Sequence, residues 1–218
     1  MPMLHRLASE GIGAFFLFAC VIGSGIMATN LSHGNDAIAL LGNTMATGAM
    51  LFVLITVLGP ISGAHMNPAV SLVAAARGEL AWPEAAAYIA VQLACGILGA
   101  WAAHLMFGLP VWQLSLKTRH GLGQMIGEGV ATFGLILTIL GTVRHRPQWV
   151  APAVALYIAA AYWFTSSTSF ANPAITVARS LSDTFAGIAP ADVPAFVAAQ
   201  FAGAALATVV GRWLFAEV

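Results

Sequence analysis

The tripeptide Asn-Pro-Ala occurs twice in this chain, and each copy lies in an otherwise apolar sequence. Proline suits the first position of a helix, because its φ is preset and the N–H it lacks would have no partner there. The asparagine before it is a preferred N-cap residue. Each copy is therefore predicted to begin a short helix whose positive dipole end lies at the motif. The residues concerned are Asn67, Pro68, Ala69, Asn172, Pro173 and Ala174.

The composition is that of a polytopic membrane protein. Charged residues make up 7% of the 218 residues, against about 25% in an average soluble protein. Apolar residues make up 60%, and the mean hydropathy is +0.88. The expected surroundings are a lipid bilayer. The formal net charge is zero, which excludes the basic surface that nucleic-acid binding requires.

The sequence offers no cofactor or metal site. Cys20 and Cys95 lie in apolar runs without a CxxC pattern or a His/Cys cluster, so we expect free, packed thiols. The first apolar run, residues 8–27, is too long for the apolar part of a signal peptide and has no clear cleavage site. We expect it to remain as the first membrane span.

A bilayer core about 30 Å thick needs about 20 apolar residues per helix. Six membrane spans are predicted, at residues 8–29, 37–58, 84–106, 123–143, 150–164 and 193–215. Residues 61–76 are rich in small residues and too short to span. We interpret them as a re-entrant loop followed by a half-helix over 68–76. A Ser/Thr-rich stretch leads into a second half-helix, predicted over 173–183.

The two halves of the chain repeat. Glu10 in the first span corresponds to Glu128 in the fourth, and Gln92 in the third span corresponds to Gln200 in the sixth. Three spans per half is an odd number, so the second half enters the membrane from the opposite face. The predicted fold is an all-α membrane protein with six spans and two half-helices. It forms one transmembrane domain, residues 1–218, with inverted repeats at about 1–110 and 120–218.

An even number of spans places both termini on one side of the membrane. Five arginines, Arg6, Arg77, Arg144, Arg146 and Arg212, fall on that side, and Lys117, Arg119 and Arg179 fall on the other. The positive-inside rule therefore predicts that both termini are cytoplasmic, in the inner (plasma) membrane.

Together these motifs resemble the aquaporin and glycerol-facilitator superfamily, the major intrinsic proteins. Residues 62–70, Ser-Gly-Ala-His-Met-Asn-Pro-Ala-Val, are nearly the family's first signature, and the second Asn-Pro-Ala and the paired Glu and Gln residues agree with it. The resemblance covers essentially the whole chain. It implies a passive channel rather than an enzyme, assembled as a homotetramer in which each subunit has its own pore for water or small neutral solutes.

The resemblance also assigns roles to particular residues. Asn67 and Asn172 would donate hydrogen bonds to passing solutes, while the half-helix dipoles behind them repel cations, including hydronium. Glu10 and Glu128 would brace the re-entrant loops by accepting backbone N–H groups. The carbonyl of His65 would line the pore, with its ring packed in the loop.

One position departs from the common family pattern. Most relatives have arginine directly after the second Asn-Pro-Ala, whereas this chain has Ile175 there and Arg179 four residues later. Helical side chains lean toward the N-terminus, so Arg179 either reaches partway back or only lines the outer mouth. The other constriction positions in the family register are Thr47, Ala160 or alternatively Tyr162, and Ser169. We expect a wider and less cationic ring.

This pattern is similar to the bacterial subfamily associated with arsenic-resistance operons. The resulting hypothesis is a channel for arsenite, methylarsenicals and glycerol-like polyols as well as water. The first alternative is an ordinary water-selective aquaporin whose filter arginine is replaced by Arg179. An ion-coupled secondary transporter also uses inverted repeats, but the spans carry no acidic or histidine chain beyond Glu10 and Glu128. No catalytic constellation favours a membrane enzyme.

Overall fold

The computed structural model describes residues 1–216, which form helices and contain no strand. The α-helices are α1 (Met3–Ser32), α2 (Asp36–Ser62), α3 (Pro68–Ala76), α4 (Trp82–Met106), α5 (Leu122–His145), α6 (Val150–Phe164), α7 (Pro173–Ser180) and α8 (Val193–Leu214). Two 3₁₀ turns, Pro147–Trp149 and Pro190–Asp192, precede α6 and α8. The last two residues of the predicted second repeat, 217 and 218, lie outside the described residues.

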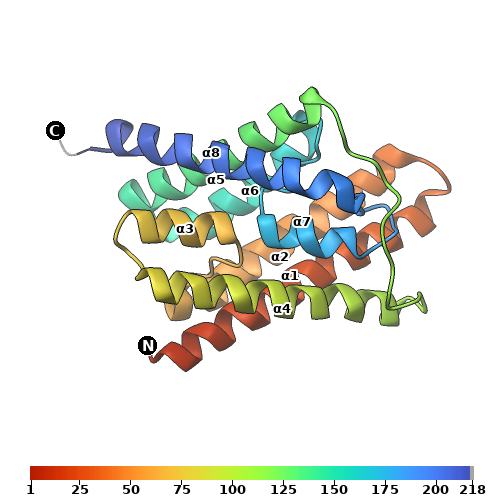
Figure 1. The fold of residues 1–218 in the computed structure, drawn as a ribbon, viewed down its shortest axis with the longest axis horizontal. Helices are drawn as coiled ribbons and strands as arrows, with labels where there is room; N and C mark the ends of the chain where they lie inside the picture. Colours follow the sequence, from red (N-terminus) through yellow and green to blue (C-terminus); the bar gives the residue numbers. More distant parts are fainter. Residues whose placement is uncertain (217–218) are drawn as a thin grey trace.

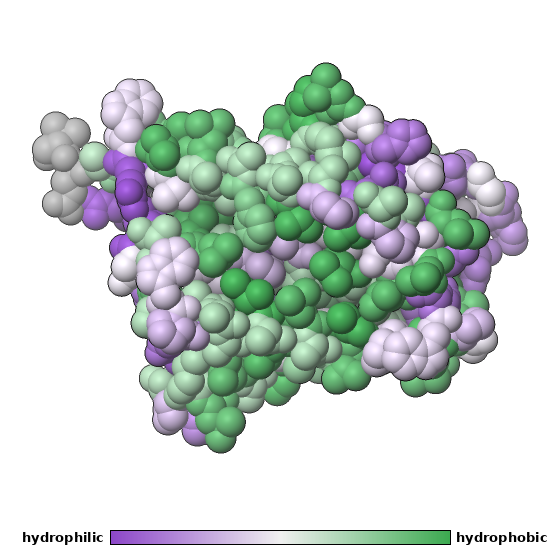
Figure 2. All heavy atoms as spheres, viewed as in Figure 1, coloured by the Kyte–Doolittle hydropathy of each residue, from purple (hydrophilic) through white to green (hydrophobic). Residues whose placement is uncertain are grey.

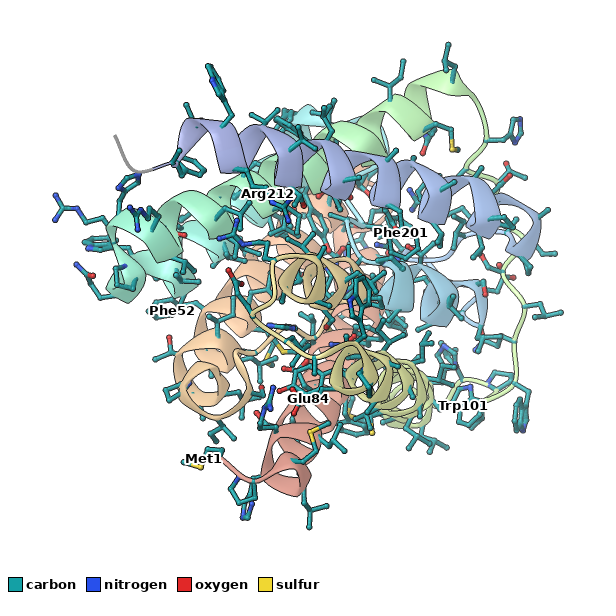
Figure 3. The ribbon with its side chains drawn as sticks, turned by 60° about the vertical axis from the view of Figure 1, so that its left-hand side comes forward. Met1, Phe52, Glu84, Trp101, Phe201 and Arg212 are labelled. Carbon is teal, nitrogen blue, oxygen red and sulfur yellow. The ribbon has the colours of Figure 1, made fainter. Side chains whose placement is uncertain are left out.

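The long helices form a bundle, and the two short helices α3 and α7 lie end to end between α4 and α8 (Figure 1). Helix α1 packs against α2 and α4, and in the other half α5 packs against α6 and α8. The view in Figure 3 shows α3 surrounded by the longer helices, while Phe52 on α2 lies on the outer side. The beginning of α1 and the end of α8 lie at the same end of the bundle (Figure 1). The matching helix contacts in the two halves, α1 with α2 and α4 and α5 with α6 and α8, are those expected for an inverted repeat.

The outer surface of the bundle suits a bilayer. Figure 2 shows hydrophobic residues across the middle of one face, with hydrophilic residues toward the two ends. Among residues 1–216, five helices are long and apolar enough to cross a membrane: α1, α2, α4, α5 and the α8 segment from Pro190. Apolar side chains such as Phe52 and Leu156 are exposed on the outside. We conclude that the chain is an integral membrane protein.

The fifth predicted span, α6, is the short one. It has 15 residues, fewer than the usual 20 or so. The 3₁₀ turn Pro147–Trp149 directly precedes it. At 1.5 Å per α-helical residue and about 2.0 Å per 3₁₀ residue, residues 147–164 rise about 28 Å, close to the thickness of a bilayer core. The 3₁₀ turn thus supplies the missing length.

Several predicted helix ends differ from the structure, and α1, predicted over 8–29, covers Met3–Ser32. Helix α2, predicted to end at residue 58, continues to Ser62, because the N–H of Gly63 bonds the carbonyl of Gly59 at 2.9 Å and closes a further turn beyond Pro60. Helix α7 was expected to reach about Asp183 but ends at Ser180. There the chain tightens, with the N–H of Ser182 bonding the carbonyl of Arg179 at 3.3 Å.

Small residues allow the paired helices to approach closely. A Cβ added at Gly99 on α4 would lie 2.2 Å from the carbonyl oxygen of Phe15 on α1. A Cβ added at Gly203 on α8 would lie 2.3 Å from the carbonyl oxygen of Gly129 on α5. Both contacts are with backbone, which cannot move aside as a flexible side chain can. In both halves a glycine thus lets two helix backbones touch, between α1 and α4 in the first half and between α5 and α8 in the second.

This contact predicts that Gly203→Ala destabilises the bundle by about 1–3 kcal/mol, the usual cost of overpacking. The measurement is the thermal unfolding midpoint of the detergent-solubilised protein. Gly59→Ala is the control, because a Cβ at Gly59 has no atom within 4 Å. Equal midpoints for Gly203→Ala and the wild type would contradict the close approach of α5 and α8.

Candidate functional site

The two half-helices meet at their N-termini. Asn67 is the N-cap of α3, its side-chain oxygen accepting the N–H of Ala69, and Asn172 is the N-cap of α7. Each asparagine also bonds across to the other loop. The Nδ2 of Asn67 donates to the carbonyl of Ala171 at 2.8 Å, and the Nδ2 of Asn172 donates to the carbonyl of Met66 at 2.8 Å. The junction is therefore held by a reciprocal pair of hydrogen bonds.

The loops that supply these carbonyls adopt a left-handed backbone. Met66 and Ala171, each directly before its asparagine, have φ of 47°. Such a conformation costs a non-glycine residue roughly 1–2 kcal/mol. Ala64 and Ser169, three residues before each asparagine, also have positive φ, at 49° and 48°. The two loops therefore have the same conformation, and it is held by contacts from outside the loops.

In the first half, those contacts come from Glu10 on α1. Its carboxylate accepts the N–H of His65 at 2.8 Å and the N–H of Met66 at 2.6 Å. The Nε2 of Gln92 on α4 donates to the same carboxylate at 2.8 Å and to the hydroxyl of Ser71 on α3 at 3.1 Å. Glu10 and Gln92 are fully buried, so these bonds are shielded from water.

The second half repeats this arrangement. Glu128 on α5 accepts the N–H groups of Phe170 at 2.8 Å and Ala171 at 2.9 Å. The Nε2 of Gln200 on α8 donates to Glu128 at 2.6 Å and to the hydroxyl of Thr176 on α7 at 2.9 Å. The sequence showed the paired glutamines as a repeat but not that they complete the network.

A cavity of about 250 Å³ runs past the junction. Its lining includes Glu79 just after α3, Val143 near the end of α5, Tyr162 near the end of α6 and Arg179 near the end of α7. The ends of α3 and α5 lie at the end of the bundle that carries the termini (Figure 1). Both junction asparagines contribute to the lining. Much of the remaining wall is apolar, with Leu17, Val21, Leu51, Leu135, Val154 and Ile158 among the lining residues.

Five of the six residues expected at the constriction line the far end of this cavity: Thr47, Tyr162, Ser169, Ile175 and Arg179. Ala160 does not. Ala160 is exposed on the outer side of α6. It lies two residues before Tyr162, which is a rotation of about 200° about the helix axis, so the two side chains point to opposite sides of α6. Of the two alternatives left open by the sequence, the structure therefore places Tyr162 in the lining. Its hydroxyl donates to the hydroxyl of Thr47 at 3.4 Å.

Arg179 lies in the cavity wall rather than outside it. Its side chain is 2% exposed, and its Nε donates to the carbonyl of Ala186. The guanidinium carbon lies 3.3 Å from the centre of the Phe170 ring, a close cation–π contact. Arg179 is therefore a lining residue of the cavity one helical turn beyond Ile175, which itself lines the cavity directly after the motif.

The remaining expected residue, His65, also contributes to the cavity lining. Its Nδ1 lies 3.1 Å from the hydroxyl of Ser71, and its ring packs edge-on against Tyr88 at 5.5 Å. Phe170, which the sequence analysis did not single out, supports Arg179. Its position after the Ser/Thr-rich stretch carries no pattern that would have revealed this role.

The braces predict that Glu128→Gln destabilises the second loop by about 1–3 kcal/mol, because one amide oxygen cannot accept both N–H groups and a buried donor loses its partner. The thermal unfolding midpoint in detergent measures the loss. Glu84→Gln is the control, since Glu84 forms only a partly exposed ion pair with Arg6. A midpoint equal to that of the control would contradict the bracing role.

Comparisons with known proteins agree with this geometry. The family description "Major intrinsic protein" matches residues 1–149. The chain is 53% identical over 212 residues to Aquaglyceroporin AqpS of Rhizobium meliloti (strain 1021), covering 97% of this chain and 91% of that protein. It is 28% identical over 230 residues to Aquaporin Z of Bradyrhizobium diazoefficiens, covering 98% and 95%.

A solved structure shows the same fold. The X-ray structure of the aquaglyceroporin from Plasmodium falciparum matches with a TM-score of 0.75 at 19% sequence identity, covering 95% of each chain. The buried braces, the paired half-helices and the cavity between them thus occur in a chain whose relatives are channels rather than enzymes. The chain belongs to the major intrinsic protein family, the aquaporins and glycerol facilitators, and is a membrane channel for water and small solutes.

Proposed function

We propose that this channel conducts small uncharged polyhydroxyl solutes, namely arsenite, methylarsenicals and glycerol-like polyols, together with water. The observation that carries the proposal is the side chain at position 175. An isoleucine, 4% exposed, lines the cavity where most relatives place an arginine. The relative named an aquaglyceroporin, at 53% identity, supports a solute larger than water.

The polar groups at this end of the cavity suit a hydroxylated solute. Ser169 is a lining residue of the cavity, and its buried hydroxyl has no hydrogen-bond partner among residues 1–216. Thr47 and Tyr162, whose hydroxyls are hydrogen-bonded to each other at 3.4 Å, are lining residues as well. Arsenite is neutral As(OH)₃ at neutral pH and is similar in shape to glycerol. Its hydroxyls would bond these groups while Ile175 contacts the rest of the molecule.

Ions and protons are excluded, in this proposal, at the junction of the half-helices. Each asparagine gives one N–H to the opposing loop, which leaves its second N–H available to a solute oxygen. The N-termini of α3 and α7 add positive potential at the same place. A single file of water would accept hydrogen bonds there from both sides, so a continuous proton wire is interrupted.

A water-selective channel is the second candidate. Arg179 and Tyr162 favour it, because a guanidinium and an aromatic ring both stand in the lining at the outer end. An ion-coupled transporter has less support. The carboxylates of Glu10 and Glu128 each accept two loop N–H groups and a glutamine amide, which leaves them poorly placed to bind a coupling ion.

We propose that both termini are cytoplasmic, in the inner membrane, since the end of the bundle carrying them holds five arginines: Arg6, Arg77, Arg144, Arg146 and Arg212. The proposed assembly is a homotetramer, with each subunit containing its own pore. It rests on the resemblance to the family.

The direct test of the proposed solute is uptake into proteoliposomes. Glycerol entry measured by stopped-flow light scattering, and arsenite entry measured by arsenic content, should exceed entry into protein-free vesicles. Fast water flow without entry of either solute would mean that Arg179 closes the outer end, and would favour the water-selective alternative.

The role of position 175 predicts that Ile175→Arg reduces glycerol and arsenite entry at least roughly tenfold, the effect of about 1.4 kcal/mol on a barrier. Water flow should persist, because a water molecule still passes a narrower ring. Ile175→Val, which keeps an apolar side chain, is the control and should conduct solutes as the wild type does. Unchanged solute entry in Ile175→Arg would contradict the proposal that this position sets the ring.

A further inference from the structure

The loop between α4 and α5, residues 107–121, is fixed to the outer end of the channel. The N–H of Ser115 bonds the carbonyl of Ser180 at 2.9 Å, and the N–H of Ala189 bonds the carbonyl of Lys117 at 2.7 Å. The N–H of Arg119 donates to the carboxylate of Asp192 at 2.7 Å. This loop, called the outer loop below, is therefore held against the segment that follows α7 and cannot move independently of it.

The side chain of Arg119 extends from the outer loop into the protein. It is 7% exposed. Its Nε donates to the carbonyl of Gly187 at 2.8 Å, and its Nη1 donates to the carbonyl of Ser167 at 3.3 Å. Its guanidinium carbon lies 4.9 Å from the centre of the Phe170 ring. One side chain thus connects the outer loop, the segment after α7 and the loop before the second Asn-Pro-Ala.

Arg179 depends on the same supports. Its Nε donates to the carbonyl of Ala186, the residue next to Gly187, and its guanidinium packs on the same Phe170 ring. A Cβ at Gly187 would lie 2.4 Å from the carbonyl oxygen of Ser182, so this segment is packed tightly against the end of α7. A shift of the segment that Arg119 holds would therefore move the carbonyl that holds Arg179.

Both side chains are cations that lack a carboxylate partner within residues 1–216. Burial lowers the pKa of Arg119 to about 10, so it remains charged at neutral pH. Its charge is balanced by carbonyl dipoles and the face of an aromatic ring. The planar guanidinium suits this geometry, because its N–H groups point in fixed directions that a lysine cannot reproduce.

We propose that Arg119 is a positioning residue for the outer constriction. It ties residues 165–171 to residues 184–189 and thereby sets where the Arg179 guanidinium stands in the cavity wall. Arg119 is not itself among the cavity-lining residues, so it acts on solute selection through Arg179. The inference rests on the proposed function, in which the side chains at 175 and 179 determine which solutes pass.

The test compares variants by the ratio of glycerol to water permeability in proteoliposomes. Arg119→Gln should raise this ratio severalfold, in the same direction as Arg179→Ala, because a less fixed Arg179 obstructs larger solutes less. His120→Gln is the matched control. His120 is the next residue of the same outer loop, but it is exposed, so its replacement leaves the segment that holds Arg179 untouched.

Two further variants distinguish positioning from charge. Arg119→Lys keeps the charge but not the fixed, planar pair of N–H donors, so it should behave like Arg119→Gln. A wild-type ratio in Arg119→Lys, or a raised ratio in His120→Gln, would overturn the inference. Arg119→Gln combined with Arg179→Ala should give the ratio of Arg179→Ala alone, since interacting residues are not additive. Additive effects would also overturn it.

Failure of the inference can be separated from failure of the proposed function. If Arg179→Ala changes the ratio and Arg119→Gln does not, the positioning role is wrong and the proposed constriction stands. If neither Arg179→Ala nor Ile175→Arg changes the ratio, the proposed constriction itself is wrong. Thermal unfolding in detergent checks that each variant is folded. If Arg119→Gln does not fold, Arg119→Lys supplies the test in its place.

Discussion

The rest of the structure depends on the reciprocal hydrogen bonds between the two half-helices. Asn67 bonds the carbonyl of Ala171, and Asn172 bonds the carbonyl of Met66. For these carbonyls to be presented, both loops must hold a left-handed residue at membrane depth, and their N–H groups must be satisfied away from water. Glu10 and Glu128 meet that need. The expensive burial of two carboxylates in a membrane protein is therefore explained by the junction they support.

The two halves are alike at the junction and differ toward the outer end. The carboxylate, glutamine and hydroxyl of each brace occur in both repeats. Only the second half carries a buried arginine in its half-helix, Arg179, supported by Phe170 and by the segment after α7. In the proposed function, the symmetric part forms the passage and the asymmetric part selects the solutes. This division agrees with the family, in which the same fold serves channels for water and for larger solutes.

The features predictable from the sequence were the local ones. Asparagine is a preferred N-cap and proline suits the first helical position after it. Both half-helix beginnings could therefore be predicted without knowing the fold. Helix ends were less certain, because the stop of α7 at Ser180 depends on the chain folding back toward Arg179. The choice between Ala160 and Tyr162 depended on the rotation of α6 about its axis, which an almost uniformly apolar helix does not reveal.

The burial of Arg119 could not be predicted, since a cation in a polar loop is usually exposed. Its partners, the carbonyls of Ser167 and Gly187, lie 48 and 68 residues away in the sequence. Backbone carbonyls leave no residue-type pattern that would identify them as partners. The same holds for Phe170, whose importance comes from the two guanidiniums placed against it. Such contacts appear only when the loops are seen in three dimensions.

The measurement that tests the central claim most directly follows water and proton movement in the same proteoliposomes. Osmotic water flow is recorded by stopped-flow light scattering, and proton flux by an enclosed pH-sensitive dye under an imposed pH gradient. The paired half-helices predict water flow well above that of protein-free vesicles, with a proton flux no greater than theirs. A proton flux that rises with the amount of reconstituted protein would contradict the account of the junction.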